Sequence, residues 1–390
     1  MIEHSQSSVI PTHCKANSTD VIAHFNEVIQ APLNELATQA NHVFVTGAGG
    51  FLGKAICRLL RLAGIRVTGF ARGNYPELEQ MGVKMVQGDI TDYIRLKEAM
   101  KTCDLVFHVA AKAGVWGSKE DYFEPNVQGA KNVIQACQEL EITRLVYTST
   151  PSVTFAGVDE AGIDESTSYA HTFLNFYGES KALAEQLVLA ASNPPRQAHG
   201  HAEEPSQNVK SEKVLKTVAL RPHLIWGPND PHLVPRVLER ARAGKLKLVG
   251  NEDKLVDTIF VDNAAYAHIL AAVVINRPEA ICSGKAYFIS NDQPITMAAM
   301  LNKILHCVDL PPVTKRVPTS VAYAVGATLE WFYKTLNIKH EPVMTRFVAR
   351  QLSTCHYFDI SAAKKDLGYT PLISIEEGMK QLKLSLEVSN

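Results

Sequence analysis

The sequence predicts an α/β fold, in which a doubly wound parallel sheet carries a smaller C-terminal lobe. Three observations lead to this prediction. Short runs rich in β-branched and aromatic residues alternate with helix-like segments from residue 41 onwards, as in parallel strands joined by right-handed crossovers. A glycine-rich turn separates the first run from the first helix-like segment. Beyond residue 230 the alternation weakens, which indicates a lobe interleaved with the last core elements near 257–275.

The expected elements follow one another in chain order. The first strand, "HVFVT", precedes the glycine turn, and the helix after that turn closes at Gly64, a residue type that commonly ends helices. Strands are expected at 42–46, 65–72, 84–89, 104–110, 144–150 and 216–228, and the helices between them include 54–64 and 122–140. Ligands of such sheets bind at the carboxyl ends of the strands, so the candidate functional residues are sought there.

Two segments lie outside this alternation. Residues 1–40 form an N-terminal extension in which we expect a short helix, because one apolar stripe follows a Ser18/Thr19 cap and contains Val21, Ile22, Phe25, Val28 and Ile29. Residues 192–213 are polar, rich in Pro and Gln and without periodicity, which is typical of a flexible surface insert.

Composition excludes several classes of protein. The 390 residues are 46% apolar with a formal net charge of -1, so no global attraction to nucleic acid or to anionic lipid is expected. No apolar run reaches the roughly 18 residues of a membrane span, and the N-terminus lacks the pattern of a secretory signal. The seven cysteines are scattered and never spaced as CxxC. We therefore expect a cytoplasmic protein with reduced thiols and no metal site.

The glycine-rich turn predicts a dinucleotide-binding loop. In "FVTGAGGFLGKAI", Gly47, Gly50 and Gly53 are spaced as GxxGxxG between a strand and a helix. Glycine permits a tight turn and a close approach of the backbone, and the helix N-terminus can then receive a pyrophosphate. Residues 41–230 are accordingly expected to form the dinucleotide-binding domain, and residues 231–390 the substrate-binding lobe.

The end of the second strand indicates which cofactor is bound. Enzymes selective for NAD usually place an acid there, on the ribose hydroxyl, but this chain has no Asp or Glu between Gly53 and Glu77. Arg72 stands in its place, and a guanidinium can pair with a 2′-phosphate. A solvated surface arginine is the alternative. We predict NADP(H) rather than NAD(H), with Asp89 at the end of the third strand near the adenine.

A Tyr-x-x-x-Lys pair supplies a candidate acid and base. The two side chains lie on one helical face, where an ammonium group can favour the phenolate and lower the pKa of the tyrosine. The chain has two such pairs, Tyr93/Lys97 and Tyr177/Lys181. Only the second follows a strand that ends in hydroxyl groups, Ser149 and Thr150, which could donate to a developing oxyanion.

Several motifs in order resemble the extended short-chain dehydrogenase/reductases, whose nucleotide-binding domain has the Rossmann fold. They are "TGAGGFLG", "GDITD", "HVAA", "YTSTPSV", "YGESK", "LRPHLIWGP" and "FVDNAAYAH", and the resemblance runs from about residue 41 to the C-terminus apart from 192–213. Within this superfamily the chain is most similar to the 3β-hydroxysteroid and sterol 4-carboxylate dehydrogenases. "HVAAKAGVWGS" and "TSTPSVTFAG" resemble more closely the bacterial reductases of 2-alkyl-3-oxoalkanoates in long-chain olefin synthesis.

The resemblance implies roles for named residues. Tyr177 would be the general acid and base, and Lys181 would lower its pKa and hold the nicotinamide ribose. Thr150 stands where the family often has serine, so either Thr150 or Ser149 would donate to the oxyanion. The residues implied to contact the cofactor are Gly47, Gly50, Phe51, Leu52, Gly53, Arg72, Asp89, Ile90, Ala110, Lys112, Tyr177, Lys181 and His223.

The function expected from the resemblance is reduction of the 3-keto group of a long-chain 2-alkyl-3-oxoalkanoate by NADPH. The alternatives are oxidation of a 3β-hydroxysteroid or sterol 4-carboxylate, a nucleotide-sugar epimerase or dehydratase, and a non-catalytic NADP(H) sensor. A dehydratase would usually have an Asp-Glu pair after the active-site hydroxyl, and "STPSV" has none. The family tendency is a homodimer, and the pathway offers thiolase-like and ligase-like enzymes as partners in a complex.

One segment of the C-terminal lobe is unusually apolar. "VAYAVGATLEWFYKTL" includes Tyr323, Leu329, Trp331, Phe332 and Leu336. The common explanation is an amphipathic helix that packs on its own core. The functional alternatives are a wall for an acyl or sterol-like substrate, or a surface that contacts a membrane or a partner.

Overall fold

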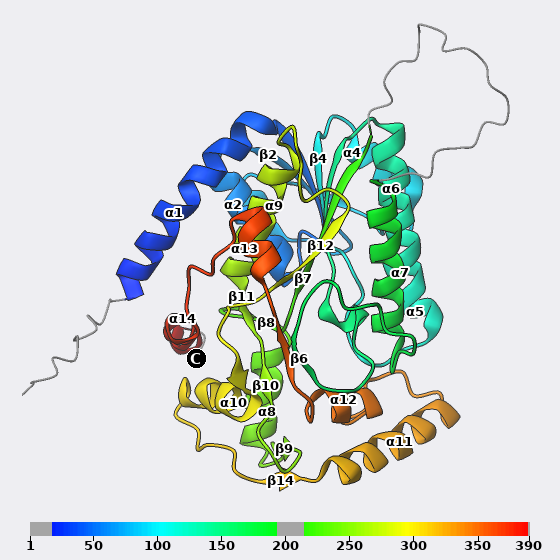
Figure 1. Cartoon of the computed structure of the whole chain (residues 1–390), viewed down its shortest axis with the longest axis vertical. Coiled ribbons are helices and arrows are strands. Elements are labelled where there is room, and N and C mark those ends of the chain that lie inside the picture. Colours follow the sequence, from blue (N-terminus) through cyan, green and yellow to red (C-terminus); the bar gives the residue numbers. More distant parts are fainter. Residues whose placement is uncertain (1–17, 193–213, 389–390) are drawn as a thin grey trace, which may run out of the picture.

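A seven-stranded parallel sheet forms the centre of the protein, in a computed structural model that describes residues 18–192 and 214–388 (Figure 1). The strand order is β12-β7-β5-β4-β1-β2-β3, so the chain winds outward in both directions from β1 and β4. This confirms the doubly wound α/β fold. The strands are β1 (His42–Thr46), β2 (Arg66–Ala71), β3 (Lys84–Gln87), β4 (Leu105–His108), β5 (Arg144–Thr148), β7 (Lys216–Pro222) and β12 (Lys285–Ile289).

Helices cover both faces of this sheet (Figure 1). One face carries α2 (Phe51–Leu62) and α9 (Val261–Ile275), and the other carries α4 (Tyr93–Met100), α6 (Gly129–Glu139) and α7 (Phe176–Ala190). Helix α9 is apolar on all sides and is buried along almost its whole length. A helix of this composition can only be stable inside a protein, and α9 lies between the sheet and further helices.

The helix predicted at 122–140 consists of three pieces, so that prediction was wrong in its details. Helix α5 (Lys119–Phe123) begins earlier, because Ser118 and Asp121 form a reciprocal capping box. A π-helical turn, η1 (Glu124–Gln128), then precedes α6. Such a turn inserts one extra residue into the helix and changes the direction of its side chains, and it is frequent at functional sites.

The lobe is built from short strands and helices. A four-stranded sheet has the order β13-β10-β15-β6, and two strand pairs join β8 with β11 and β9 with β14. The strands are β6 (Glu160–Ile163), β8 (Ile225–Trp226), β9 (Leu248–Val249), β10 (Leu255–Val256), β11 (Ile259–Phe260), β13 (Ile295–Thr296), β14 (Arg316–Val317) and β15 (His356–Phe358). The helices are α8 (Leu233–Arg242), α10 (Met297–His306), α11 (Thr319–Thr335), α12 (Arg346–Gln351), α13 (Ser361–Leu367) and α14 (Ile375–Val388).

The two parts of the chain exchange elements across residue 230. Strand β6 precedes this residue but pairs with β15 in the sheet of the lobe. Strand β12 and helix α9 follow it but belong to the central sheet and its cover. The lobe is therefore tied to the core by pairing in both directions.

Helix α1 (Ser18–Gln39) lies against α9 on the outside of the fold (Figure 1). It is longer than the short helix that the sequence suggests. Phe25 and Ile29 of the predicted stripe are buried, Val28 is half-buried, and the stripe continues through Leu33 and Leu36. The side chains of Val21 and Ile22, residues 1–17 and the predicted insert from 193 to 213 lie outside the described residues.

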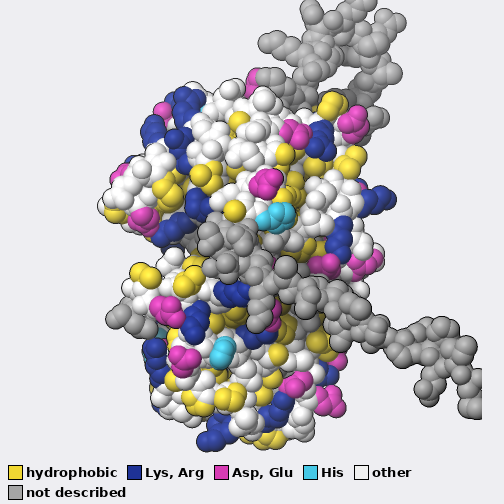
Figure 2. Space-filling view, turned by 90° about the vertical axis from the view of Figure 1, so that its left-hand side faces the viewer, with side chains coloured by type: hydrophobic (Ala, Val, Ile, Leu, Met, Phe, Trp, Pro, Cys, Tyr) yellow, Lys and Arg dark blue, Asp and Glu magenta, His cyan; other side chains and the backbone are white. Residues whose placement is uncertain are grey.

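The surface carries charges of both signs. On the face shown in Figure 2, lysines and arginines alternate with acidic side chains, and apolar side chains lie between them. No helix within residues 18–192 and 214–388 is long and apolar enough to cross a bilayer.

Candidate active site

The carboxyl end of β5 meets the first turn of α7. After β5 the chain turns through Ser149 and Thr150 into a 3₁₀ turn, η2 (Pro151–Val153). The side chain of Asn175 caps α7 by accepting from the Gly178 N–H at 2.9 Å. Gly178 allows α7 to approach closely, since a Cβ there would lie 2.9 Å from the Ser152 carbonyl oxygen. The two elements therefore bring Tyr177 beside the hydroxyls that follow β5.

Tyr177 forms a hydrogen bond with Thr150. Burial raises the pKa of the phenol, and the bond with Thr150 opposes this rise. Ser149 lies deeper, with its Oγ buried and without a partner among the described residues, while its N–H donates to the Leu220 carbonyl at 2.6 Å. Of the two hydroxyls, only that of Thr150 is in contact with Tyr177.

Lys181 lies one helical turn after Tyr177 and is 2% exposed. Its ammonium group donates to the Thr148 carbonyl at 2.7 Å and stands 4.1 Å from the centre of the Tyr147 ring. Burial lowers the pKa of Lys181 to about 7, against the opposing effect of Glu185. The lysine is thus poised between its charged and neutral forms, and it is anchored to the strand end.

Asn126 is a site residue that sequence reasoning missed. It lies in the π-helical turn η1, and its amide accepts from the Lys112 N–H at 2.7 Å and donates to the Lys112 carbonyl at 3.1 Å. It also donates to Ser180 Oγ at 2.9 Å. Asn126 therefore joins the loop after β4 to the helix of Tyr177 and Lys181. The sequence signal is weak, because only a π-helical turn aims this side chain inward.

Tyr122 extends this connection. Its hydroxyl donates to the Trp116 carbonyl at 3.1 Å, and its ring centre lies 6.5 Å from that of Tyr177. The Lys112 ammonium stands 5.4 Å from the Tyr122 ring centre. The loop after β4 thus forms one side of the site around Tyr177.

The glycine loop has the shape of a phosphate cradle. Gly47 has φ +65°, in the left-handed region that favours glycine. A Cβ on Gly53 would lie 2.1 Å from the Gly47 carbonyl oxygen, so any side chain there would displace the loop. Gly50 caps α2 without a side-chain hydrogen bond. The first N–H groups of α2 are therefore free to bind an anion, and the residues present fit a dinucleotide pyrophosphate.

Phe51 and Leu52 open α2 immediately after this loop, and Leu52 is buried. Ala110 lies on the other side of the loop, where a Cβ on Gly47 would come within 2.8 Å of its backbone. The Ala110 N–H donates to Thr46 Oγ1 at 3.1 Å. The structure therefore brings the ends of β1 and β4 together.

Arg72 and Asp89 lie at the ends of neighbouring strands. Arg72 is exposed, and its guanidinium forms no ion pair within the described part of the chain. Asp89 accepts from the Thr91 N–H at 3.0 Å and from its hydroxyl at 2.7 Å. The pKa of Asp89 is lowered by these bonds and, more weakly, by Arg72. Ile90 is buried against Gly129.

Tyr75 is a second residue that sequence reasoning missed. Its ring packs on the glycine loop, since a Cβ on Gly49 would lie 2.1 Å from the ring. The Lys54 ammonium stands 5.2 Å from the ring centre and pairs with Glu77 at 2.6 Å. Tyr75 therefore covers the loop near the end of β2. No motif in the sequence singles it out.

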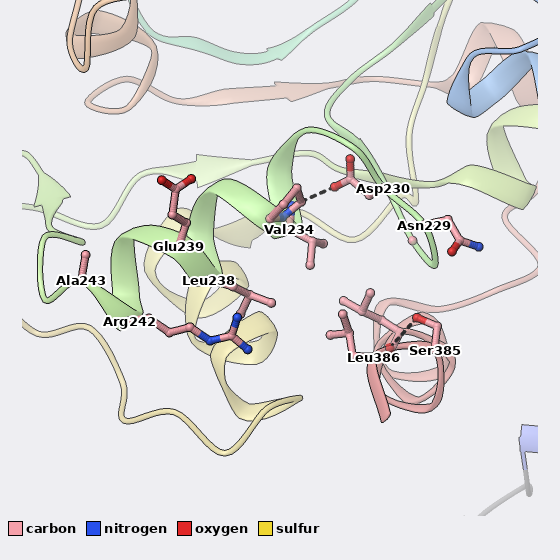
Figure 3. Close-up of a pocket in the computed structure, with 12 residues that line it drawn as sticks. Asn229, Asp230, Val234, Leu238, Glu239, Arg242, Ala243, Ser385 and Leu386 are labelled. Atoms are coloured by element: carbon pink, nitrogen blue, oxygen red, sulfur yellow. Dashed lines mark hydrogen bonds between the residues drawn. The ribbon is translucent and has the colours of Figure 1, made fainter. Parts of the chain in front are cut away.

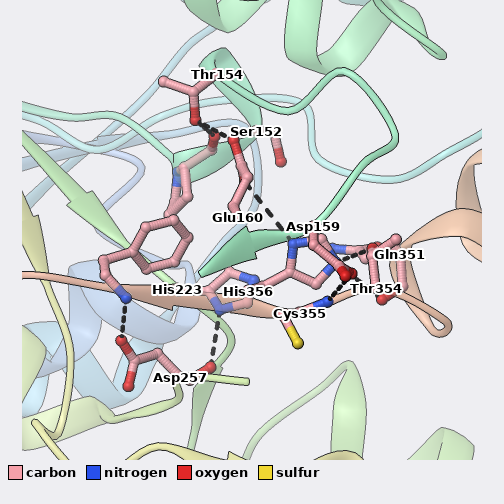
Figure 4. Close-up of polar contacts among 12 residues, drawn as sticks. Ser152, Thr154, Asp159, Glu160, His223, Asp257, Gln351, Thr354, Cys355 and His356 are labelled. Carbon is pink, nitrogen blue, oxygen red and sulfur yellow. Dashed lines mark hydrogen bonds and ion pairs between the residues drawn. The ribbon is translucent and has the colours of Figure 1, made fainter. Parts of the chain in front are cut away.

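His223 directly follows β7, which pairs with β5. Figure 4 shows it beside Asp257 and His356. Its Nδ1 donates to the Asp257 carbonyl at 2.8 Å, because a carbonyl oxygen can only accept. Burial, followed by the nearby His356, lowers the pKa of His223 to about 3. The ring is therefore neutral at physiological pH, and its Nε2 is a hydrogen-bond acceptor.

His356 stands behind His223 in a buried polar cluster (Figure 4). The two ring centres are 5.8 Å apart, and the Nδ1 of His356 lies 3.8 Å from the Glu160 carboxylate. Glu160 is buried and accepts from the Thr154 hydroxyl at 2.7 Å. This cluster connects the strand end at His223 to β6 and β15 of the lobe.

A cavity of about 520 Å³ lies between α8 and α14, away from this site (Figure 3). Its wall is mostly apolar, with Leu238 on one side and Leu386 on the other, and the Arg242 guanidinium reaches its rim. None of the predicted site residues lines it. No group of three or more His, Cys, Asp or Glu side chains that could hold a metal occurs in the described residues.

The family follows from comparison with known proteins. Residues 44–315 match the model of the 3-beta hydroxysteroid dehydrogenase/isomerase family. The chain belongs to this family. It is 65% identical to a 2-alkyl-3-oxoalkanoate reductase of Shewanella oneidensis, over 92% of this chain and 89% of that protein. A protein of the same name in Stenotrophomonas maltophilia is 46% identical, over 88% of this chain and 98% of that one.

Other family members are more distant. The human sterol-4-alpha-carboxylate 3-dehydrogenase, decarboxylating, is 33% identical over 97% of this chain and 95% of its own. The relatives are reductases and dehydrogenases, and the alignments cover nearly their whole length. The chain is therefore an oxidoreductase of this family.

Solved structures bear out the fold. An epimerase of Methanothermobacter thermautotrophicus matches with a TM-score of 0.71 at 19% identity, covering 93% of this chain and 96% of that one. A UDP-glucose 4-epimerase matches with a TM-score of 0.67 at 18% identity, covering 90% and 98%. At this level of identity the likeness concerns the fold alone.

Proposed function

We propose that this oxidoreductase reduces the 3-keto group of a long-chain 2-alkyl-3-oxoalkanoate to the 2-alkyl-3-hydroxyalkanoate, with NADPH as the reductant, in long-chain hydrocarbon synthesis. The observation that carries the substrate assignment is the 65% identity to a 2-alkyl-3-oxoalkanoate reductase over 92% of the chain. The contact between Tyr177 and Thr150 supports the reaction type, because it places an acid and a second hydroxyl donor together after β5.

The residues of the chain would handle the oxygen of the substrate. A bound nicotinamide cofactor supplies the hydride that adds to the 3-carbon. As the carbonyl electron pair moves to oxygen, Tyr177 donates its proton there, and Thr150 donates a hydrogen bond to the developing charge. Lys181 favours the tyrosinate that remains, since its ammonium lies one turn away. Ser149 would support the carboxyl end of β5 from the interior of the protein.

The cofactor would lie along the carboxyl edge of the sheet. The glycine loop would hold its pyrophosphate, with Phe51 and Leu52 at the start of the helix. Arg72 would bind the 2′-phosphate, and Asp89 with Ile90 would border the adenine. Ala110 and Lys112 would line the middle of the groove. His223 would accept a hydrogen bond from the nicotinamide amide, because its Nε2 is an acceptor.

A second candidate keeps the chemistry and changes the substrate. The human sterol-4-alpha-carboxylate 3-dehydrogenase is 33% identical over 97% of the chain, which favours a 3β-hydroxysteroid or sterol 4-carboxylate as the alternative. The higher identity to the alkanoate reductases puts this reading second.

The test uses the oxidative direction, because a free β-keto acid readily loses carbon dioxide. Purified protein is given NADP+ and a long-chain 2-alkyl-3-hydroxy acid, and NADPH formation is followed. We expect turnover by the wild type, and for Tyr177→Phe a fall in kcat of about 10² to 10⁴-fold with cofactor binding retained. Turnover of a 3β-hydroxysteroid in place of the hydroxy acid would contradict the proposed substrate. Unchanged turnover in Tyr177→Phe would contradict the proposed acid.

A further inference from the structure

Helix α11 packs on the protein through small residues and an acid. A helix that packs on its own core usually buries its large apolar residues instead. Its inner face carries a small residue, a glycine and a paired acid, Ala322, Gly326 and Glu330, all of them buried. Gly326 lets the helix touch the chain at Thr345, since a Cβ there would lie 2.6 Å from that backbone. Glu330 pairs with Arg346 at 2.8 Å. This face is therefore fully occupied by the segment that leads into α12.

Several large apolar side chains at or next to α11 point outward. Val321, Val325, Phe332 and Leu336 are 46–56% exposed, and their spacing places them on one stripe. Trp331 beside them is 67% exposed. The common explanation for this apolar segment, packing on its own core, therefore holds for the small residues and in part for Tyr323, which packs on a core cluster, and for the half-buried Leu329. We call Val321, Val325, Trp331, Phe332 and Leu336 the α11 stripe.

The charges carried by the α11 segment itself are mostly basic. In residues 319–340 the single acid is Glu330, which is buried and paired. Lys334, Lys339 and His340 are exposed near the end of the helix. Asp121, an exposed acid of α5, lies near Lys339. An exposed apolar stripe with a tryptophan and flanking lysines is complementary to an anionic lipid surface.

The end of α11 is connected to the candidate active site. Trp116, in the loop after β4, donates to the Ile338 carbonyl at 3.1 Å and packs edge-on against Tyr333. Its own carbonyl accepts from Tyr122, whose ring lies next to that of Tyr177. The loop of Trp116 therefore lies beside the C-terminal end of α11. Figure 1 shows α11 along the outer edge of the lobe, with α12 on its inner side.

We propose that the α11 stripe docks the protein on an anionic phospholipid surface, with the loop of Trp116 beside the C-terminal end of the docked helix. Docking buries the stripe in the headgroup region and places the lysines against lipid phosphates. Docking would let a long-chain substrate pass from the bilayer to the site. Only this consequence for the substrate rests on the proposed function.

The test is co-sedimentation of the full-length protein with vesicles of equal parts phosphatidylglycerol and phosphatidylcholine, compared with phosphatidylcholine alone. We expect binding to the anionic vesicles that falls about tenfold or more in Trp331→Ser/Phe332→Ser. Lys334→Gln/Lys339→Gln is expected to weaken binding several-fold at low salt, and only for the anionic vesicles. Ile94→Ser, which changes a side chain that is 81% exposed on α4, is the matched control and should bind as the wild type does.

Two results would overturn the proposal. One is a wild type that stays in the supernatant, or one whose sedimentation the Trp331→Ser/Phe332→Ser change does not affect. The other is a wild-type dimer in sedimentation velocity that becomes monomeric in this variant, because the stripe would then belong to a second copy of the chain. The experiment contains no substrate, so its outcome is independent of the proposed reaction, and a melting curve of each variant confirms its folding.

Discussion

Lys181 shows at the residue scale how burial sets the chemistry of this site. Its pKa of about 7 compares with 10.5 for an unburied lysine, and desolvation is the main cause. The Thr148 carbonyl and the Tyr147 ring keep the ammonium in place. The same desolvation raises the pKa of Tyr177. The ionisation of both groups is therefore decided by the packing around them.

A dependence of stability on pH follows from Lys181. Between about pH 7 and 10 the unfolded chain holds a proton that the folded chain has lost, so the folded state gains stability as the pH rises. Below pH 7 Lys181 is protonated in both the folded and the unfolded chain, and the full desolvation penalty of the buried ammonium remains. We expect the unfolding free energy of wild type minus Lys181→Met to rise by about 1.4 kcal/mol per pH unit from pH 7.5 to 9.5.

Urea unfolding at several pH values measures this difference. Lys84→Met, at an exposed lysine of β3, is the control and should give a curve parallel to the wild type. A parallel curve for Lys181→Met as well would show that burial does not depress the pKa of Lys181.

In the proposed site, Arg72 would decide the preference for NADP(H) over NAD(H). Its charge-assisted bonds to a 2′-phosphate would be lost in Arg72→Gln, so we expect the KM for NADP+ to rise about 10 to 100-fold while that for NAD+ stays the same. Arg66→Gln, at the exposed opposite end of β2, is the matched control. A rise in KM for both cofactors would show that Arg72 does not read the phosphate.

At the scale of elements, the π-helical turn η1 positions the site. It directs Asn126 onto both backbone groups of Lys112 and onto Ser180. The motifs in the sequence predict a helix here but not its interruption. The π-helical turn can be recognised only in the folded structure, because Asn126 forms its hydrogen bonds with the neighbouring loop and with α7.

Asn126→Ala tests this role. It leaves the Lys112 and Ser180 groups without partners, so we expect a loss of about 2 to 3 kcal/mol in unfolding free energy and a lower kcat. Asn132→Ala is the matched control, since Asn132 is buried and bonds the Ile90 and Thr91 carbonyls. It should cost similar stability and leave kcat close to wild type. If Asn126→Ala and Asn132→Ala changed kcat equally, Asn126 would have only a structural role.

At the scale of the whole molecule, helix α1 completes the hydrophobic core. Phe25 is 3% exposed and packs edge-on against Tyr266 of α9. Since α9 also contacts the central sheet, α1 stabilises the face opposite to Tyr177. Residues that fall outside the dehydrogenase motifs are thus part of the same core.

Phe25→Ala is expected to lower the unfolding free energy by about 3 kcal/mol and to leave the KM for the cofactor unchanged. Thermal and urea unfolding measure the first quantity, and steady-state kinetics the second. His24→Ala, at the adjacent exposed position, is the control. A wild-type stability in Phe25→Ala would mean that α1 is only loosely attached to the fold.

The sequence by itself determined the order of strands and helices, the glycine loop and the Tyr177/Lys181 helix. These features depend on local rules, such as the alternation of apolar residues and the backbone freedom of Gly47. These features can be predicted from the sequence because each rule acts within about twenty residues of the chain.

Only the tertiary structure decided the position of Tyr75 on the glycine loop, the inward turn of Asn126, the pairing of β6 with β15 and the outward face of α11. Periodicity shows that α11 has an apolar face but not which face the core will take. That choice depended on Gly326 and Glu330, because a close backbone contact at Thr345 and the ion pair of the buried Glu330 with Arg346 hold one face and leave the other to the outside.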